Sequence, residues 1–375
     1  MALRATASVN LAAIERNCRL LSTTIGASTA LCAVVKADGY GHGAAGAARA
    51  ALAGGATWLA VATATEAAAL RAAGIDARLL VLGAVGDEEL EVALDADADI
   101  VAWRDPFIDH LAARAAERGA PIRVHLKLDV GMGRLGTRDA DELLTLADRV
   151  ATAPGLDLTG AMTHFPSADE DLALTRSQLD AFVAFGDRLR AAHPGVLLHA
   201  ANSAAALDLP ESRLDMVRCG IAVYGLDPAN ADAGARGLEP ALELCSYVAA
   251  LKPLAPGETV GYGACFVAGA PTWIATLPIG YGDGVRRALS DNGEVLIAGR
   301  RYPIVGRVSM DNITVDVGPD PVVEIGDDAV LIGAQGEERI AAEEVARRIG
   351  TINYEVTTGL LPRATRRLHR DGRPV

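Results

Sequence analysis

The sequence predicts an α/β protein: a (β/α)8 barrel, the TIM barrel architecture, followed by a second, mainly β C-terminal domain. Short apolar runs recur eight times through the first two-thirds of the 375 residues, and stretches with helical spacing separate most of them. After about Pro240 the segments are short, β-branched and bounded by Gly/Pro turns. Alternating strands and helices imply a parallel sheet, and eight such units close a barrel.

The eight expected strands are short apolar runs in the first part of the chain. Segments between them, such as "TEAAALRAAG" and "LDAFVAFGDRLRAA", carry apolar residues at helical spacing. In chain order, the expected strands are Leu31–Val35, Trp58–Ala62, Leu79–Leu82, Ile100–Trp103, Ile122–Leu128, Leu158–Thr163, Val196–His199 and Met216–Tyr224.

The C-terminal part has a different pattern. Segments such as "LELCSYVAAL", "TWIATLPIG" and "ITVDVG" indicate strands, and one late helix is expected at "AAEEVARRIG". The Ala-, Gly- and Asp-rich stretch Asp227–Leu238 is the expected boundary. The sequence therefore predicts a barrel domain over residues 1–235 and a mainly β domain over residues 236–375.

The charge, the cysteine content and the apolar runs of the sequence exclude several classes of partner and cellular location. A net charge of −13 argues against nucleic acid or an acidic membrane surface as the main partner, although local groups can still hold a small anion. The five cysteines are dispersed and form no CxxC pair, which fits a reducing compartment. The start "MALRATASVNL" lacks the apolar core of a signal peptide, and no run approaches a membrane span. We therefore expect a soluble, cytoplasmic protein.

The stretch "AVVKADGYGHG" places a lysine, Lys36, at the mouth of a buried strand and allows two interpretations. In the first, Gly41-x-Gly43-x-x-Gly46 is a dinucleotide-binding loop of a nicotinamide oxidoreductase, with Glu66 as the ribose-binding acid. However, five residues separate the strand from the glycines, and Glu66 falls inside an expected helix. In the second interpretation, Lys36 is itself the reactive group.

Polar residues gather at the expected strand ends, where barrels place their active sites. His125, Lys127 and Asp129 fall on one face of their strand, because side chains alternate with a period of two. Each group also has a purely structural interpretation, such as an ion pair, a core histidine or a helix cap. The further residues at strand ends are Arg134, His164, Asn202, Ser203, Arg218 and Gly220.

Two chemistries could use this set. A metallohydrolase with a carbamate on Lys127 typically needs an HxH pair on a strand, which the seven histidines do not provide, so no metal site is expected. A pyridoxal phosphate enzyme needs a lysine, a phosphate cradle and a partner for the pyridine nitrogen. Lys36, the region of Ser203 and Gly220, and Arg218 could supply these three elements.

The chain closely resembles the alanine racemase family of pyridoxal 5'-phosphate-dependent, fold-type III enzymes. The resemblance implies a barrel plus a β domain, and a homodimer in which residues of both subunits build each active site. It extends over nearly the whole chain and rests on eight motifs in order: "AVVKADGYGHG", "LKLDVGMGRLG", "ANSAA", "VRCGIAVYG", "VGYGACF", "LPIGYGDGVRR", "VGRVSMDN" and "TINYEV".

The resemblance also implies residue roles. Lys36 would bind the cofactor covalently and act as one catalytic base, and Tyr262 of the partner subunit's β domain would be the other. Arg218 would face the pyridine nitrogen, and His164 would link Arg218 to Tyr262. The phosphate-site residues would be Tyr40, Asn202, Ser203, Tyr354 and the backbone at Gly220 and Ile221. Arg134, Tyr281 and the Met310 backbone would contact the substrate and the cofactor, and Lys127 matches a position that is often a carbamate.

The proposed chemistry has its own physical logic. Racemisation removes a proton from one face of the α carbon and returns one on the other, so two bases on opposite sides suit it. Lysine and tyrosine are weak bases at their ordinary pKa of about 10, and nearby cations must lower both. Arginine does not readily give a full proton to pyridine, because its pKa exceeds about 12. The ring is then a weaker electron sink, which disfavours transamination.

The sequence predicts an amino-acid racemase that interconverts L- and D-alanine and supplies D-alanine for cell-wall peptidoglycan. The alternatives are a broader racemase of the same fold acting on serine or lysine, and a non-catalytic pyridoxal phosphate carrier. Carriers lack the β domain, so Tyr262 in "VGYG" argues against that class. The chain departs from the family pattern at Val130, at Pro166-Ser167 and in the tail "LLPRATRRLH".

Overall fold

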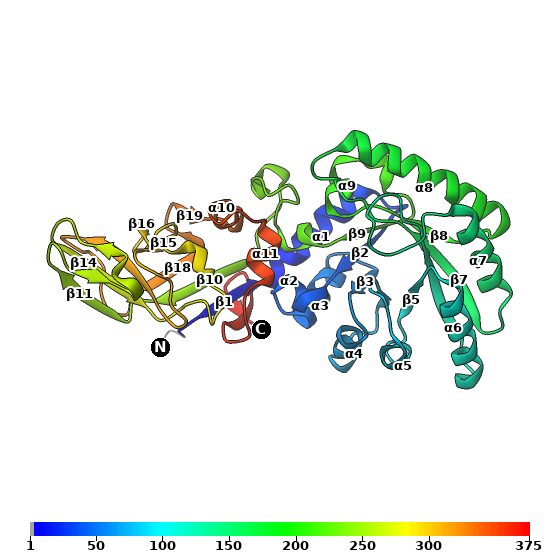
Figure 1. The fold of residues 1–375 in the computed structure, drawn as a ribbon, viewed down its shortest axis with the longest axis horizontal. Helices are drawn as coiled ribbons and strands as arrows, with labels where there is room; N and C mark the ends of the chain where they lie inside the picture. The colour runs from blue at the N-terminus through cyan, green and yellow to red at the C-terminus, as the bar shows by residue number, and fades with distance from the viewer. Residues whose placement is uncertain (1–3) are drawn as a thin grey trace. The chain divides into compact units, whose positions relative to one another are not determined.

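A computed structural model describes residues 4–375, which form two compact units (Figure 1). Residues 14–39 and 44–223 make up the first, called here the barrel unit. Residues 4–13, 40–43 and 224–375 make up the second, called the β unit. The division at residues 235 and 236 remains a prediction, since the grouping in the structure includes short N-terminal segments in the β unit.

Eight parallel strands form the barrel, in the order β8-β7-β6-β5-β4-β3-β2-β9. Backbone hydrogen bonds from Asp215 N–H to Leu198 O (3.1 Å) and from Arg218 N–H to Ala201 O (2.9 Å) join its two ends. The predicted α/β barrel is confirmed. The strands are β2 (Ala30–Val34), β3 (Trp58–Val61), β4 (Arg78–Val81), β5 (Asp99–Ala102), β6 (Ile122–Lys127), β7 (Leu156–Met162), β8 (Leu197–His199) and β9 (Met216–Cys219).

Helices cover the outer side of this sheet (Figure 1). In α7, for example, Leu143, Leu146, Ala147 and Val150 are buried at helical spacing, and the Asp139 carboxylate caps the first turn. The helices are α1 (Leu11–Ile25), α3 (Ala44–Ala53), α4 (Ala64–Ala72), α5 (Asp87–Asp95), α6 (Asp105–Arg118), α7 (Ala140–Thr152), α8 (Leu172–Ala192) and α9 (Ser203–Asp208), and a short turn α2 (Lys36–Tyr40) follows β2.

The eighth barrel strand is shorter than predicted. It ends at Cys219, and Ile221–Tyr224 form a 3-10 turn, η2, instead of continuing the strand. The hydrogen bond from Val223 N–H to Gly220 O (2.9 Å) closes this turn. The apolar run extends through both segments because the turn is also fully buried.

The β unit is built from a large mixed sheet, a three-stranded sheet and a two-stranded ribbon. The large sheet has the order β16-β15-β18-β10-β1-β20-β21, with β19 paired to β18; the smaller ones are β11-β14-β17 and β12-β13. The strands are β1 (Thr6–Asn10), β10 (Leu242–Tyr247), β11 (Ala250–Leu254), β12 (Thr259–Val260), β13 (Phe266–Val267), β14 (Thr272–Leu277), β15 (Glu294–Ile297), β16 (Arg300–Pro303), β17 (Ile313–Gly318), β18 (Asp328–Gln335), β19 (Glu338–Ile340), β20 (Thr365–Arg370) and β21 (Arg373–Pro374).

Two features of the β unit differ from the sequence-based prediction. The N-terminal strand β1 pairs with β10 and β20, and Ala7 and Val9 are its fully buried positions. The predicted late helix is α10 (Ala342–Arg348), and a second helix, α11 (Asn353–Thr358), follows it. None of the helices formed by residues 4–375 combines the length and apolar character needed to cross a bilayer.

Candidate active site

Strand β2 leads into a left-handed turn that carries Lys36. In α2 (Lys36–Tyr40), Ala37, Asp38 and Gly39 have φ angles of 51°, 52° and 62°. Left-handed backbone costs a non-glycine residue about 1–2 kcal/mol, and such strain gathers at functional sites. The turn places Lys36 at the C-terminal end of a barrel strand, where the active sites of such barrels lie.

The Glu66 carboxylate holds this turn. It accepts hydrogen bonds from the backbone N–H of Ala37 (2.6 Å), Ala62 (2.8 Å) and Thr63 (3.2 Å). Thr63 and Glu66 also form the capping box of α4. Glu66 therefore has a structural role at the end of β2, in contrast to the ribose contact that the dinucleotide interpretation requires.

Several cations of the barrel unit act on one another electrostatically. Burial lowers the pKa of the Lys36 amine, Arg134 and Arg218 lower it further, and Glu66 opposes them. Lys127 ends β6 and is 4% exposed. Burial lowers the pKa of Lys127 to about 8, with Arg218 and Arg134 adding to the effect. Such a group of positive charges suits an anionic ligand.

The loop after β6 is organised by Asp129. Its carboxylate accepts hydrogen bonds from the backbone N–H of Gly131 and Gly133 at 3.0 Å and from Arg138 Nε at 3.1 Å. These contacts shape the loop that carries Arg134. Asp129 therefore shapes its own loop, and its charge also opposes the lowering of the pKa of the nearby Lys127.

The guanidinium of Arg218 is held from several sides. Nη1 donates to the Nδ1 and the backbone oxygen of His199, both at 2.9 Å. Nη2 donates to the backbone oxygens of Thr163 (2.7 Å) and Ala200 (3.0 Å) and lies 3.3 Å from His164 Nδ1. Burial lowers the pKa of Arg218 to about 10, so it remains a cation at neutral pH. Burial and the Arg218 charge hold the pKa of His164 well below its ordinary value.

Ser203 joins two strand ends of the barrel. Its hydroxyl oxygen accepts hydrogen bonds from the backbone N–H of Gly220 (2.9 Å) and Ala222 (3.4 Å), and the side chain is nearly buried. Asn202 caps α9 with its side-chain oxygen, 3.0 Å from a backbone N–H of the first turn. Ile221 follows Gly220 in the fully buried turn η2. In these two bonds the hydroxyl oxygen is the acceptor, so the Ser203 O–H can still act as a donor.

Two tyrosines assigned to the phosphate contact each other in the β unit. The ring of Tyr40 stacks on Tyr224, with centroids 5.1 Å apart, and lies 6.2 Å from the tilted ring of Tyr354. Tyr40 is 8% exposed, and Tyr354 lies in the first turn of α11. The aromatic contacts fix the orientation of the Tyr40 ring.

Tyr262 is the most exposed aromatic of the predicted set, at 74%. It opens the short turn η4 (Tyr262–Ala264), between Gly261 with φ 78° and Gly263 with φ 74°. Both φ values lie in the region that favours glycine. This turn presents the phenol to the outside of the β unit, so an ordinary core-packing role does not explain Tyr262.

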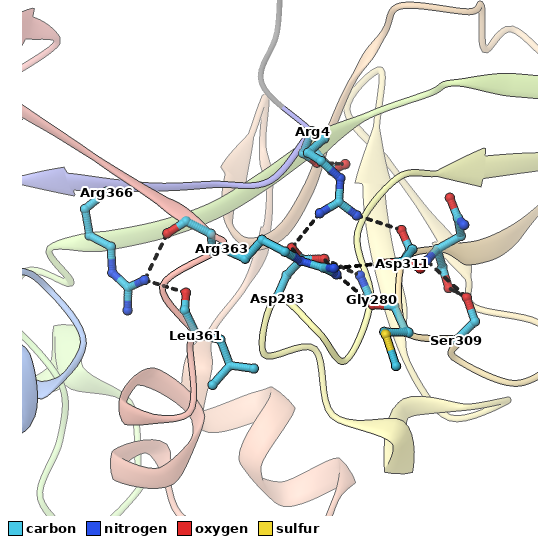
Figure 2. Close-up of polar contacts among 12 residues, drawn as sticks. Arg4, Gly280, Asp283, Ser309, Asp311, Leu361, Arg363 and Arg366 are labelled. Carbon is cyan, nitrogen blue, oxygen red and sulfur yellow. Dashed lines mark hydrogen bonds and ion pairs between the residues drawn. The ribbon is translucent and has the colours of Figure 1, made fainter.

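An ion cluster around Asp283 joins two segments of the β unit, residues 280–283 and 309–311 (Figure 2). The buried Asp283 carboxylate accepts hydrogen bonds from Arg4 Nη1 and Arg363 Nε, both at 2.8 Å, and from Gly280 N–H at 2.9 Å. Arg363 Nη1 binds the Asp311 carboxylate at 2.8 Å.

The backbone joins the same two segments. Tyr281 N–H donates to Ser309 O at 3.0 Å, and Gly282 N–H donates to Met310 O at 2.9 Å. Arg363 Nη2 also donates to Met310 O at 2.9 Å. The side chains of Tyr281 and Met310 remain 41% and 52% exposed. The cluster therefore fixes the backbone of two segments whose side chains face outward.

The structure divides the predicted site residues between the units. The barrel unit carries Lys36, Lys127, Arg134, His164, Asn202, Ser203, Arg218, Gly220 and Ile221, and the β unit carries Tyr40, Tyr262, Tyr281, Met310 and Tyr354. The supporting roles of Glu66, Asp283 and Arg363 were not predicted from the sequence. The pattern "TATE" could have indicated the capping role of Glu66.

Comparison with known proteins identifies the family of this chain. Sequence models of the alanine racemase N-terminal and C-terminal domains match residues 9–228 and 241–368. An alanine racemase of Desulforamulus reducens is 42% identical over 355 residues, which cover 93% of this chain and 95% of the relative.

Solved structures agree with this relationship. The alanine racemase from the D-cycloserine-producing Streptomyces lavendulae is similar with a TM-score of 0.93 and 37% identity, covering 98% of each chain. The alanine racemase from Bacillus anthracis with bound L-Ala-P has a TM-score of 0.92 and 37% identity, covering 100% of this chain and 97% of the other. Because the matches extend over both units at these identities, the chain belongs to the alanine racemase family and is an isomerase.

Proposed function

We propose that this protein interconverts L-alanine and D-alanine with pyridoxal 5'-phosphate as cofactor, using Lys36 and Tyr262 as bases on opposite faces of the substrate. The observation that carries the proposal is the lowered pKa of the Lys36 amine at a barrel strand end, together with its electrostatic coupling to Arg134 and Arg218. The product D-alanine would serve peptidoglycan synthesis in the cytoplasm.

The residues of the barrel unit fit the cofactor. Lys36, Lys127, Arg134 and Arg218 repel one another, and a phosphate-bearing anion offsets that repulsion. Lys36 would bind the cofactor covalently. The contacts that we assign to the phosphate are those of Tyr40, Asn202, Ser203, Tyr354 and the backbone of Gly220 and Ile221. When bound, pyridoxal phosphate withdraws the electron pair that deprotonation leaves at the α carbon.

Arg218 would face the pyridine nitrogen. Its many carbonyl contacts orient the guanidinium, and its pKa of about 10 keeps it charged. It therefore donates a hydrogen bond and retains its proton. His164 lies beside Arg218 and, with its lowered pKa, remains neutral, so it can accept a hydrogen bond from Arg218 and position the Tyr262 phenol.

Lys36 and Tyr262 would divide the proton transfers. The lowered pKa of Lys36 favours the unprotonated amine, which is the form that accepts a proton. Tyr262 would come from the second subunit of a homodimer, which suits its exposure of 74%. Tyr281 and the Met310 backbone would come from the same subunit as Tyr262, and Arg134 would bind the substrate carboxylate or the cofactor oxygen.

We also propose a carbamate at Lys127. A pKa of about 8 leaves part of the amine unprotonated at neutral pH. The free amine attacks CO2, forms an N–C bond and releases one proton, which leaves a negatively charged carbamate. This change would turn the repulsion between Lys127 and Arg134 into attraction and would orient Arg134.

The first experiment follows D-alanine formation from L-alanine and the visible spectrum of the purified protein with pyridoxal phosphate. We expect D-alanine, and a visible band that borohydride removes with fixation of the cofactor on Lys36. The chain has only Lys36, Lys127 and Lys252 as lysines, so peptide mapping assigns the label directly. A label without D-alanine would point to serine or lysine as substrate, or to a carrier. No band would overturn the cofactor assignment.

A second experiment tests the shared site by mixing Lys36→Ala and Tyr262→Phe subunits. If Tyr262 acts on the partner's site, each mixed dimer has one intact site and one doubly altered site. With random pairing, about a quarter of the wild-type activity returns. If each subunit supplied both bases to its own site, no activity would return. Tyr302→Phe is a matched control that should keep full activity.

A further inference from the structure

A row of buried side chains crosses the barrel unit and ends at Arg218. Asp99 of β5, His125 of β6 and His199 of β8 are all fully buried. His125 Nε2 lies 3.1 Å from Asp99 Oδ2, and His125 Nδ1 lies 2.9 Å from His199 Nε2. His199 Nδ1 in turn lies 2.9 Å from Arg218 Nη1. Four strands thus contribute one continuous chain of hydrogen bonds.

The chemistry of the groups fixes which atom is the donor and which is the acceptor in each hydrogen bond of this row. A guanidinium only donates hydrogen bonds, so His199 Nδ1 must accept the bond from Arg218. His199 then carries its proton on Nε2 and donates to His125 Nδ1. His125 carries its proton on Nε2 and donates to Asp99. Both imidazoles are neutral in this arrangement, which agrees with the strongly lowered pKa of His199 that burial and Arg218 produce.

Asp99 anchors the far end of the chain. Its carboxylate also binds Arg78 Nη2 at 2.7 Å and Arg123 Nε at 2.6 Å. Burial favours the neutral acid, but the bonds from His125, Arg123 and Arg78 outweigh burial and hold the pKa of Asp99 below its ordinary value. Asp99 therefore remains an acceptor, and it fixes the proton of His125 on Nε2.

We propose that Asp99, His125 and His199 are positioning residues that fix the orientation of the Arg218 guanidinium by locking both imidazoles in their Nε2–H tautomers. The proposal rests on the proposed function for the role of Arg218 at the pyridine ring. Without the anchor, His199 can adopt the Nδ1–H tautomer, which sets a donor against the Arg218 donor. The guanidinium must then turn away from His199, and its contact with the ring is misaligned.

The first test needs neither a variant nor racemase activity. Long-range ¹⁵N–¹H spectra of the full-length protein, labelled at histidine and loaded with pyridoxal phosphate, report the tautomer of each imidazole. We expect the Nε2–H tautomer of both His125 and His199 at pH 8, as the direction of the hydrogen bonds requires. A protonated imidazole or an Nδ1–H form at either position would overturn the proposal.

The second test is a double-mutant cycle between Asp99 and His199. Asp99→Asn should lower kcat about tenfold, as loss of an outer partner of a functional histidine does. It should also shift the absorption maximum of the bound cofactor. His199→Asn keeps a side-chain oxygen that can accept from Arg218 without a choice of tautomer. In that background Asp99→Asn should change kcat less than about twofold, because Asp99 acts through His199.

Asp148→Asn is the matched control. Asp148 lies 2.7 Å from His193 Nε2 and so belongs to another Asp–His pair of the barrel unit, away from Arg218. This variant should leave kcat and the spectrum unchanged. An equal loss for Asp99→Asn in both backgrounds would overturn the proposal and assign Asp99 to general stability. If the wild-type protein failed to racemise alanine, the proposed function would fail, whereas the tautomers and the cofactor spectrum would still decide this inference.

Discussion

Arg363 donates two hydrogen bonds to the fully buried carboxylate of Asp283, at 2.8 and 3.1 Å. Through the same guanidinium it holds Met310 O and the Asp311 side chain (Figure 2). The pair ties the residues just before β20 to the turn that carries Tyr281. A residue in the tail that departs from the usual family pattern therefore supports the segments expected to contact substrate.

Arg363→Ala should lower the free energy of unfolding, because Asp283 loses two charged hydrogen bonds while Arg4 remains and solvent partly compensates. The KM for alanine should rise more than kcat falls, since the affected segments carry Tyr281 and Met310. Urea unfolding and steady-state kinetics measure both effects. Arg373→Ala, at an exposed position, is the control. Equal stability of Arg363→Ala and wild type would contradict the assigned role.

Glu66→Ala should slow the reaction of Lys36 with pyridoxal phosphate, whereas Thr63→Ala should lower only the stability of α4. Both substitutions break the capping box of α4, which costs about 0.5–2 kcal/mol. Only Glu66 also holds Ala37 N–H, at 2.6 Å. Borohydride trapping of pyridoxal phosphate should therefore be slower on Lys36 in Glu66→Ala and unchanged in Thr63→Ala. Similar trapping rates in the two variants would show that the cap alone is important.

Ser203→Ala should weaken cofactor binding about tenfold, which corresponds to about 1.4 kcal/mol for one hydrogen bond to a charged phosphate. The variant also leaves the Gly220 N–H without the acceptor that it has at 2.9 Å. Fluorescence titration with pyridoxal phosphate measures the Kd. Ser212→Ala is the matched control, because Ser212 is a buried serine that bonds to the Ala205 and Leu209 carbonyls. An unchanged Kd in Ser203→Ala would remove Ser203 from the phosphate site.

Lys127 should make stability depend on pH. Its pKa is about 8 in the folded chain and 10.5 when unperturbed. Between these values the unfolded chain binds the extra proton, so the stability of the wild type rises with pH in this window. Relative to Lys127→Met, the free energy of unfolding of the wild type should increase by about 2–3 kcal/mol from pH 8 to pH 10.5.

The measurement is urea unfolding of the cofactor-free chain in buffers without CO2, since a carbamate removes the titrating amine. Bicarbonate should therefore reduce the pH-dependent gain. Lys252→Met, at an exposed position of β11, serves as the control and should keep the wild-type profile. A wild-type profile parallel to that of Lys127→Met in CO2-free buffer would contradict the lowered pKa.

The sequence by itself determined the barrel, because eight apolar runs with helical segments between them leave few ways to bury a parallel sheet. It also placed Lys36, Lys127 and Arg218 at strand ends. The alternation of side chains along a strand and the end of an apolar run both depend only on neighbouring residues in the sequence. The motifs that carry the family resemblance are likewise continuous stretches of sequence.

Tertiary structure alone decided which distant groups meet. β1 has buried Ala7 and Val9, yet its partners β10 and β20 lie more than 200 residues away along the chain. The chain of Asp99, His125 and His199 depends on the register of separate strands and on closure of the barrel. Hydrogen bonds of this kind act over about 3 Å, and the position of such groups is fixed only when the whole sheet has formed.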